Sequence, residues 1–199
     1  MNENFMINKR LPVGSSGKHT SGWWGMLALI ATEAALFAYL LFSYFYLATQ
    51  ASTTWLPTTS PSLKLALPNT LILIASSFTL YWGELGIRKD KRSQLLWALG
   101  LTFILGIIFM AIQAQEWRMK PFSITDSAYG SMYFTITGFH MLHVLGGLLI
   151  LAVVFIWTAL GHFNAERHAP VAIGAIYWHF VDIVWLVVFS TFYLYPYLR

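Results

Sequence analysis

Residues 148–160 read LLILAVVFIWTAL, and this apolar run decides the fold. It carries no charge and shows no alternation of polar and apolar residues, so it is not a strand of a membrane barrel. Every backbone amide in lipid needs a hydrogen-bond partner, and a helix provides that partner within the segment itself. The run therefore predicts part of a membrane-spanning α-helix.

Four further segments have the length and apolar character of membrane spans, for which about 20 residues suffice. The five predicted helices cover residues 22–48, 68–87, 93–116, 127–160 and 169–197. Thr20 or Ser21 is a plausible cap of the first helix and Asn69 a possible cap of the second, while Pro170 suits the first turn of the fifth. The sequence predicts an all-α membrane protein, with a polar segment at residues 1–21 and one five-helix transmembrane domain over residues 22–199.

Composition supports the membrane assignment and excludes several kinds of site. Of the 199 residues, 57% are hydrophobic and 10% are charged, whereas a soluble domain has about 25% charged residues. The chain has no cysteine, which excludes disulfides, thiolate metal sites and iron–sulfur clusters. The net charge of +4 resides in short loops between apolar runs, so nucleic acid is not an expected partner. No phosphate-binding loop or nucleophile elbow is present.

The loops predict the orientation of the chain. One side collects eight of the 12 basic residues: Lys9, Arg10, Lys18, Arg88, Lys89, Lys91, Arg92 and Arg167. The other side collects Lys64, Arg118, Lys120 and Arg199. Because the side richer in Lys and Arg is normally cytoplasmic, the N-terminus is expected in the cytoplasm and the C-terminus outside, in the periplasm.

Several ionisable residues lie within the predicted helices, where a central charge costs roughly 2.5–3.5 kcal/mol. They are Glu33, His140, His143, His179 and Asp182, with Glu84 and Glu116 nearer the helix ends, where water or headgroups are expected to solvate them. His140 and His143 are three residues apart on one helix face, as are His179 and Asp182. Each such residue therefore calls for a structural or functional explanation.

Their spacing leaves four interpretations open. Histidines on facing helices could ligate a haem, with His179 as the necessary partner because His140 and His143 share one helix. The carboxylates and histidines could form a proton relay, or the three histidines could hold a metal. In the structural interpretation, His–Asp and His–Tyr hydrogen bonds join the helices over residues 127–160 and 169–197, with Asp182 buried and partnered.

Small and aromatic residues indicate close helix packing. Glycine lets membrane helices approach one another, and the third and fourth predicted helices contain Gly100, Gly106, Gly138, Gly146 and Gly147. Trp178 and Trp185 are seven residues apart on one stripe of the fifth helix, a pattern more typical of packing or partner contact than of a cofactor site.

Two motifs follow each other at a characteristic separation, TGFHMLHV at residues 137–144 and YWHFVDIVW at residues 177–185. They are preceded by ATEAALF at residues 31–37, IQAQE at residues 112–116 and PFSITD at residues 121–126. In this order the motifs resemble subunit III of the haem–copper oxidases, most of all cytochrome c oxidase subunit III. The resemblance covers nearly all of the chain from Trp23 onward. The long form of the family has seven helices, so these five resemble the short form found among bacterial oxidases.

The resemblance implies a non-catalytic subunit of a respiratory terminal oxidase, with no active site, haem or copper of its own. Its complex would oxidise cytochrome c, reduce O2 to water and pump protons, and haem and copper are expected in the partner subunits. The implied partners are the catalytic subunit I, subunit II and membrane phospholipids, with a respiratory supercomplex as a further candidate. The implied location is a bacterial inner membrane, which the chain crosses several times.

The resemblance also assigns roles to individual residues. Glu33 matches the buried, carbodiimide-reactive glutamate of the family and is expected to support proton handling or lipid contact without being essential. Packing, lipid contact or proton-handling support is implied for Glu33, Glu116, His140, His143, His179, Asp182 and Trp185. The alternatives are a quinol oxidase subunit III, an accessory protein of nitric oxide reductase, a free-standing transporter, which would usually show internal repeats or broken helices, or a membrane haem protein.

Overall fold

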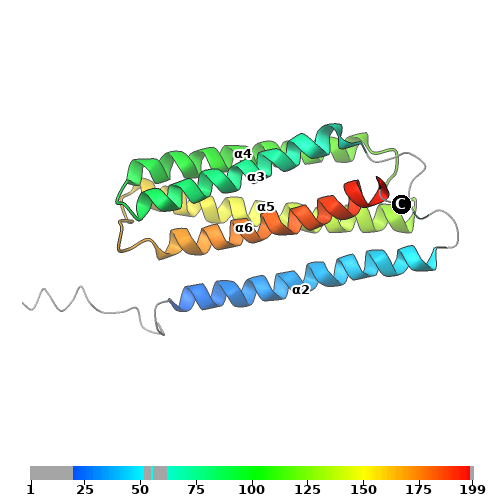
Figure 1. Cartoon of the computed structure of the whole chain (residues 1–199), viewed down its shortest axis with the longest axis horizontal. Helices are drawn as coiled ribbons and strands as arrows, with labels where there is room; N and C mark the ends of the chain where they lie inside the picture. Colours follow the sequence, from blue (N-terminus) through cyan, green and yellow to red (C-terminus); the bar gives the residue numbers. More distant parts are fainter. Residues whose placement is uncertain (1–19, 52–54, 56–61, 198–199) are drawn as a thin grey trace, which may run out of the picture.

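A computed structural model describes residues 20–51, 55 and 62–197, and five of its helices are long and apolar enough to cross a membrane (Figure 1). They are α2 (Ser21–Gln50), α3 (Leu63–Ile87), α4 (Arg92–Met119), α5 (Ala128–Ala159) and α6 (Ala169–Phe189). The prediction of five membrane helices is confirmed. Lys9, Arg10, Lys18, Arg199 and most of the segment between α2 and α3 lie outside the described residues.

Helices α3 to α6 form a four-helix bundle, and α2 lies along its side (Figure 1). In the bundle, α3 packs on α4, α4 on α5, α5 on α6 and α6 on α3, while α2 contacts α5 and α6. Only 6% of the most apolar stretch of α2 is buried within the protein, against 33% to 56% for the other helices. Most of the surface of α2 therefore faces lipid or another protein.

Helix α3 begins five residues earlier than predicted, and the expected cap at Asn69 was wrong. The side chain of Ser62 caps α3 by accepting a hydrogen bond from the N–H of Lys64 at 3.4 Å. Pro68 lies inside the helix, which is tolerated in membrane helices because neighbouring groups can satisfy the freed backbone carbonyl. Asn69 is buried instead, and its Nδ2 donates to the carbonyl of Phe109 on α4 at 3.3 Å.

The last predicted helix changes its winding near its end. The α-helical part ends at Phe189, followed by a π-turn at Ser190–Leu194 and a 3-10 turn at Tyr195–Tyr197. Ser190 and Thr191 each return a hydroxyl hydrogen bond to the carbonyl four residues earlier, at 2.7 and 2.9 Å. Such hydroxyl bonds compete with the backbone ladder, and Pro196 has no N–H with which to continue it.

The basic loops at one end of the bundle, residues 88–91 and 160–168, also tie helices together. Arg92 Nε donates to the carbonyl of Thr158 at 2.7 Å, and its guanidinium also bonds the carbonyl of Ala159, so it satisfies the C-terminus of α5. Asp90 has a φ of 58° and its Oδ1 accepts from the N–H of Ala165 at 3.2 Å. We call the end of the bundle that contains residues 88–92 and 160–168 the basic end.

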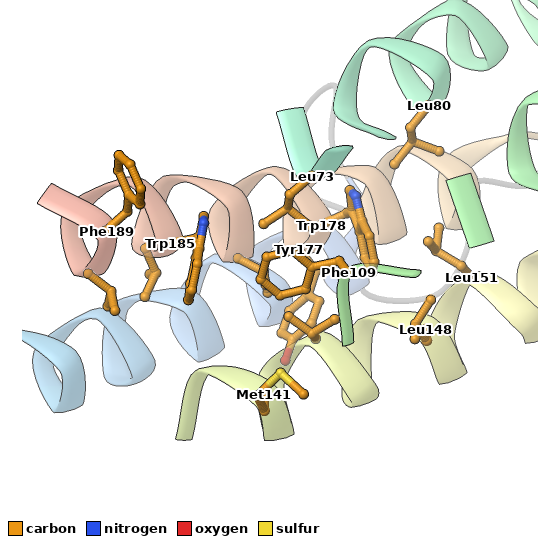
Figure 2. Close-up of a cluster of buried hydrophobic side chains, with 14 of the residues drawn as sticks. Leu73, Leu80, Phe109, Met141, Leu148, Leu151, Tyr177, Trp178, Trp185 and Phe189 are labelled. Carbon is orange, nitrogen blue, oxygen red and sulfur yellow. The ribbon is translucent and has the colours of Figure 1, made fainter. Parts of the chain in front are cut away.

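Two tryptophans of α6 form the centre of the core (Figure 2). Trp178 and Trp185 are fully buried. A Cβ atom added to Gly106 on α4 would lie 2.8 Å from the Trp178 ring, and one added to Gly147 on α5 would lie 2.8 Å from the same ring. The absence of side chains at these two positions makes room for the indole between α4 and α5.

Candidate functional site

The buried tryptophans of α6 join the bundle to α3 through hydrogen bonds. Trp178 Nε1 donates to Ser76 Oγ at 2.9 Å, and Trp185 Nε1 donates to Thr70 Oγ1 at 3.0 Å. The donors are seven residues apart on α6 and the acceptors six apart on α3, so two nearly repeating contacts fix the register of the helices. Interhelical hydrogen bonds of this kind contribute about 0.6 kcal/mol on average.

His179 and Asp182 of α6 meet on the hydroxyl of Ser77 in α3. The Ser77 Oγ lies 2.8 Å from His179 Nδ1, and it donates to Asp182 Oδ2. Asp182 is buried and His179 is half-buried. The sequence offered no specific signal for Ser77, because serine is common in membrane helices as a packing residue.

Glu33 of α2 meets His143 of α5. The His143 Nε2 lies 3.0 Å from Glu33 Oε2, while His143 Nδ1 lies 2.7 Å from the carbonyl of Phe139. Because a carbonyl only accepts, Nδ1 carries a hydrogen, and Nε2 bonds either a protonated Glu33 or, as imidazolium, its carboxylate. The Glu33 side chain is 27% exposed and that of His143 12%, so the pair is partly exposed where α2 contacts α5.

His140 has a different environment from His143, although both lie on one turn of α5. It is fully buried between Phe109, at a ring distance of 5.8 Å, and Trp185, at 4.9 Å. Neither ring nitrogen has a hydrogen-bond partner among the described residues. His140 therefore contributes packing between α4, α5 and α6 in this structure.

Glu116 is buried at the end of the bundle opposite the basic loops, so the expectation that water or headgroups solvate it was wrong. Its Oε1 lies 2.7 Å from Lys120 Nζ and accepts a hydrogen bond from the Tyr193 hydroxyl at 2.5 Å. The hydroxyls of Tyr193 and Tyr133 are 2.9 Å apart, and Lys120 Nζ lies over both rings. The carboxylate of α4 is thus buried with a hydrogen-bond donor from the π-turn after α6, and the close ammonium group of Lys120 offsets its charge.

The structure places the polar side chains in separate contacts, which changes the structural interpretation of the histidines. Among the residues it describes, no histidine of α5 bonds Asp182 directly, and Asp182 is joined to α3 instead. The Tyr177 hydroxyl does reach α5, where it donates to the backbone carbonyl of His143 at 3.4 Å. Pairing could not be predicted because helical spacing fixes the face of a residue but not the neighbouring helix.

The positions of the histidines bear directly on the metal and haem interpretations. Within the described part of the chain, no group of three His, Cys, Asp or Glu side chains is close enough to hold a metal ion. His140 and His143 point to different neighbours, and His179 is bonded to Ser77. The described histidines therefore form no preassembled ligand set.

The short loop between α4 and α5 carries one further well-defined contact. Asp126 accepts from the hydroxyl of Ser123 at 2.6 Å and from its N–H at 2.7 Å. These hydrogen bonds lower the pKa of the exposed Asp126 carboxyl below its ordinary value of 3.8 because they favour its charged form. The loop belongs to the PFSITD motif, whose aspartate thus fixes a turn.

Together the fold and these contacts define a multi-pass α-helical membrane protein whose polar side chains bond one helix to another. The family model of cytochrome c oxidase subunit III matches residues 15–197. The chain therefore belongs to the cytochrome c oxidase subunit III family, and it is a subunit III of a multi-subunit terminal oxidase. The family match favours a cytochrome c oxidase subunit III over a quinol oxidase subunit, a nitric oxide reductase accessory protein, a transporter or a haem protein.

Individual relatives agree with the family match. The chain is 39% identical to cytochrome c oxidase subunit 3 of Scyliorhinus canicula over 178 residues, which cover 85% of this chain and 68% of the relative. It is 38% identical to the Danio rerio protein of that name over 178 residues, with the same coverage of both chains. It is 36% identical to the Homo sapiens protein of that name over 177 residues, again with 85% and 68% coverage.

Proposed function

We propose that this chain is the non-catalytic subunit III of a bacterial respiratory oxidase that transfers electrons from cytochrome c to O2 and pumps protons. The match to the subunit III family over residues 15–197 carries the proposal. The polar contacts support a structural role, because Asp182, Glu116 and His143 each bond a side chain on a different helix. In this proposal the chain has no active site of its own, and haem and copper belong to its partners.

The proposed partners are the catalytic subunit I, subunit II and phospholipids of the inner membrane, with a respiratory supercomplex as a larger assembly. An apolar groove of about 460 Å³ between α4 and α5 supports lipid contact. Its lining includes Met110 of α4 and Phe134 and Leu142 of α5. An acyl chain fits this groove, because none of its lining side chains is ionisable.

We propose that Glu33 and His143 support proton handling where α2 contacts α5. The pair holds its hydrogen bond in a neutral and in an ionic form, so one proton can reside on either side chain. Glu33→Gln keeps a donor for His143 but removes the exchangeable carboxyl proton. We expect normal haem content in the complex of this variant, because the chemistry lies in other subunits; loss of the haem spectrum would contradict this role.

The experiment that tests the function is purification in mild detergent through a tag on this chain. We expect larger subunits to co-purify, with haem absorption bands and O2 consumption from reduced cytochrome c. A complex that consumes O2 only with quinol would assign the chain to a quinol oxidase. A lone, colourless, folded chain would contradict the proposal, and a lone chain carrying haem would restore the haem-protein interpretation.

A further inference from the structure

Helix α6 runs between α2 and α3 (Figure 1), and part of its surface is exposed. His179, Ile183 and Leu186 follow at helical spacing along it. Ile183 and Leu186 are exposed, and His179 is half-buried. This stripe, which we call the α6 face, therefore combines an imidazole with apolar side chains in the part of the helix that crosses the membrane.

The imidazole on this face lies at the depth of the lipid chains. His179 is ten residues from the start of α6 at Ala169, and Ser77 is ten residues from the end of α3 at Ile87. At 1.5 Å per residue both are about 15 Å from the basic end, which is half of a hydrocarbon core of about 30 Å. A half-exposed polar group at this depth is unfavourable unless something polar meets it.

The hydrogen bonds of Ser77 determine which nitrogen of His179 is left without a hydrogen-bond partner. The single Ser77 hydroxyl proton is donated to Asp182, so Ser77 accepts from the Nδ1–H of His179. In the neutral imidazole, Nε2 is then an acceptor. Within the described residues nothing donates to Nε2, whose ring neighbour Nδ1 makes the one hydrogen bond of this side chain. Acyl chains offer no donor at this depth.

We propose that the α6 face is the surface on which a membrane helix of a neighbouring oxidase subunit packs, and that this helix brings a hydrogen-bond donor to His179 Nε2. A side-chain hydroxyl, amide or indole N–H at mid-membrane depth fits this position. The proposal rests on the proposed function, because it requires that the chain belong to a complex with other membrane subunits.

A second polar residue extends the same surface towards the basic end. Glu84 is seven residues from Ser77, or about two turns, and therefore lies on the same side of α3. It is half-buried, and it forms no ion pair with the residues that the structure describes. By contrast, the groove between α4 and α5, at Met110, Phe134 and Leu142, has no ionisable lining residue and suits lipid.

The absence of cysteine allows a clean crosslinking test in the intact complex. Ile183→Cys on the α6 face and Leu142→Cys in the groove between α4 and α5 are matched, with exposures of 61% and 63%. Each variant is labelled with a benzophenone maleimide and irradiated in membranes. We expect protein adducts to a haem-containing subunit from position 183 and lipid adducts from position 142. Protein adducts mainly from position 142, or only lipid or quinone adducts from position 183, would overturn the proposal.

A second measurement tests the hydrogen bond at His179. His179→Phe keeps a planar ring but removes the acceptor, and we expect roughly three- to tenfold less of this chain to stay with the complex in detergent. His162→Phe, in the exposed loop at the basic end, is the control and should be retained like the unaltered chain. Equal retention of both variants would contradict the donor contact. If even the unaltered chain fails to co-purify with haem-containing subunits, the proposed function fails instead.

Discussion

The four-helix bundle of α3 to α6 and the helix α2 are held in different ways. The bundle surrounds Trp178 and Trp185, whose rings are buried and whose N–H groups bond α3. Helix α2 buries little of its surface, and its contacts with the bundle include the polar pair of Glu33 and His143 and aromatic contacts such as Tyr44 with Phe192. The helices of the bundle are thus held mainly by one another, whereas α2 has fewer contacts within the chain.

The largest expected effect is in the bundle core. Trp178→Ala would remove a fully buried ring and its bond to Ser76, so we expect a loss of about 3–5 kcal/mol in the free energy of unfolding. Trp97→Ala is the control, because Trp97 is 75% exposed. Unfolding in mixed detergent micelles, followed by circular dichroism, measures both. Equal effects of the two substitutions would contradict the assignment of the core.

A larger side chain next to Trp178 is expected to reduce the free energy of unfolding by less than the loss of the indole does. Gly106→Val places a side chain where even a Cβ would lie 2.8 Å from Leu148 and from Trp178, and we expect a loss of about 1–3 kcal/mol. Gly25→Val in α2 is the matched control, since nothing lies within 4 Å of a Cβ there. The same unfolding assay compares them, and a Gly106 variant as stable as the Gly25 variant would show that α4 can move away.

Loss of the contact between Glu33 of α2 and His143 of α5 is expected to have a smaller effect than either core substitution. Glu33→Leu removes the bond to His143, whereas Glu33→Gln keeps a donor for His143 Nε2. We expect the Leu variant to broaden the distance distribution between spin labels on cysteines at Tyr39 of α2 and Phe78 of α3, both of them exposed. Pulsed electron–electron resonance on the isolated chain measures this. An identical distribution in both variants would mean that the polar pair does not position α2.

The smallest expected effect lies in the loop before α5. Since its folded-state pKa is lowered, the Asp126 carboxylate supports this loop above its ordinary pKa of 3.8, and the support is lost as the pH falls through the lower folded value. We expect the amide of Ser123, which bonds Asp126, to exchange faster with solvent once the carboxyl is protonated. Comparison with Asp126→Asn isolates the effect, because that variant lacks the transition; an unchanged profile in both would contradict it.

The contrast between the regions also explains what could be predicted from sequence. Hydropathy located all five spans, because the requirement for backbone pairing in lipid acts on each segment separately. The start of α3 was misplaced because Pro68 resembled a boundary, although Ser62 caps the helix earlier. The small residues Gly106 and Gly147 were expected to allow close approach, and they do so around Trp178.

The contact partners of the ionisable residues could not be predicted from the sequence, for a physical reason. Ser76, Ser77 and Thr70 receive the polar atoms of α6, yet hydroxyl residues are ordinary in membrane helices and also bond their own backbone. Which of them meets an indole or an imidazole depends on helix rotation and neighbour choice. The burial of Glu116 likewise depends on Tyr193 and Lys120, which lie 77 and four residues away.

The most direct test of the central claim compares the oxidase with and without this chain. The complex lacking it, prepared by deletion of its coding sequence, is examined by its haem spectrum and by O2 uptake over successive turnovers. Because the chain is proposed to stabilise the catalytic subunit rather than to react with O2, the account predicts a normal haem spectrum and a near-normal initial rate, followed by earlier loss of activity than in the complete complex. Absence of the haem bands, or an initial rate of zero in an otherwise assembled complex, would contradict the proposal that this chain supports the catalytic subunit without taking part in the chemistry.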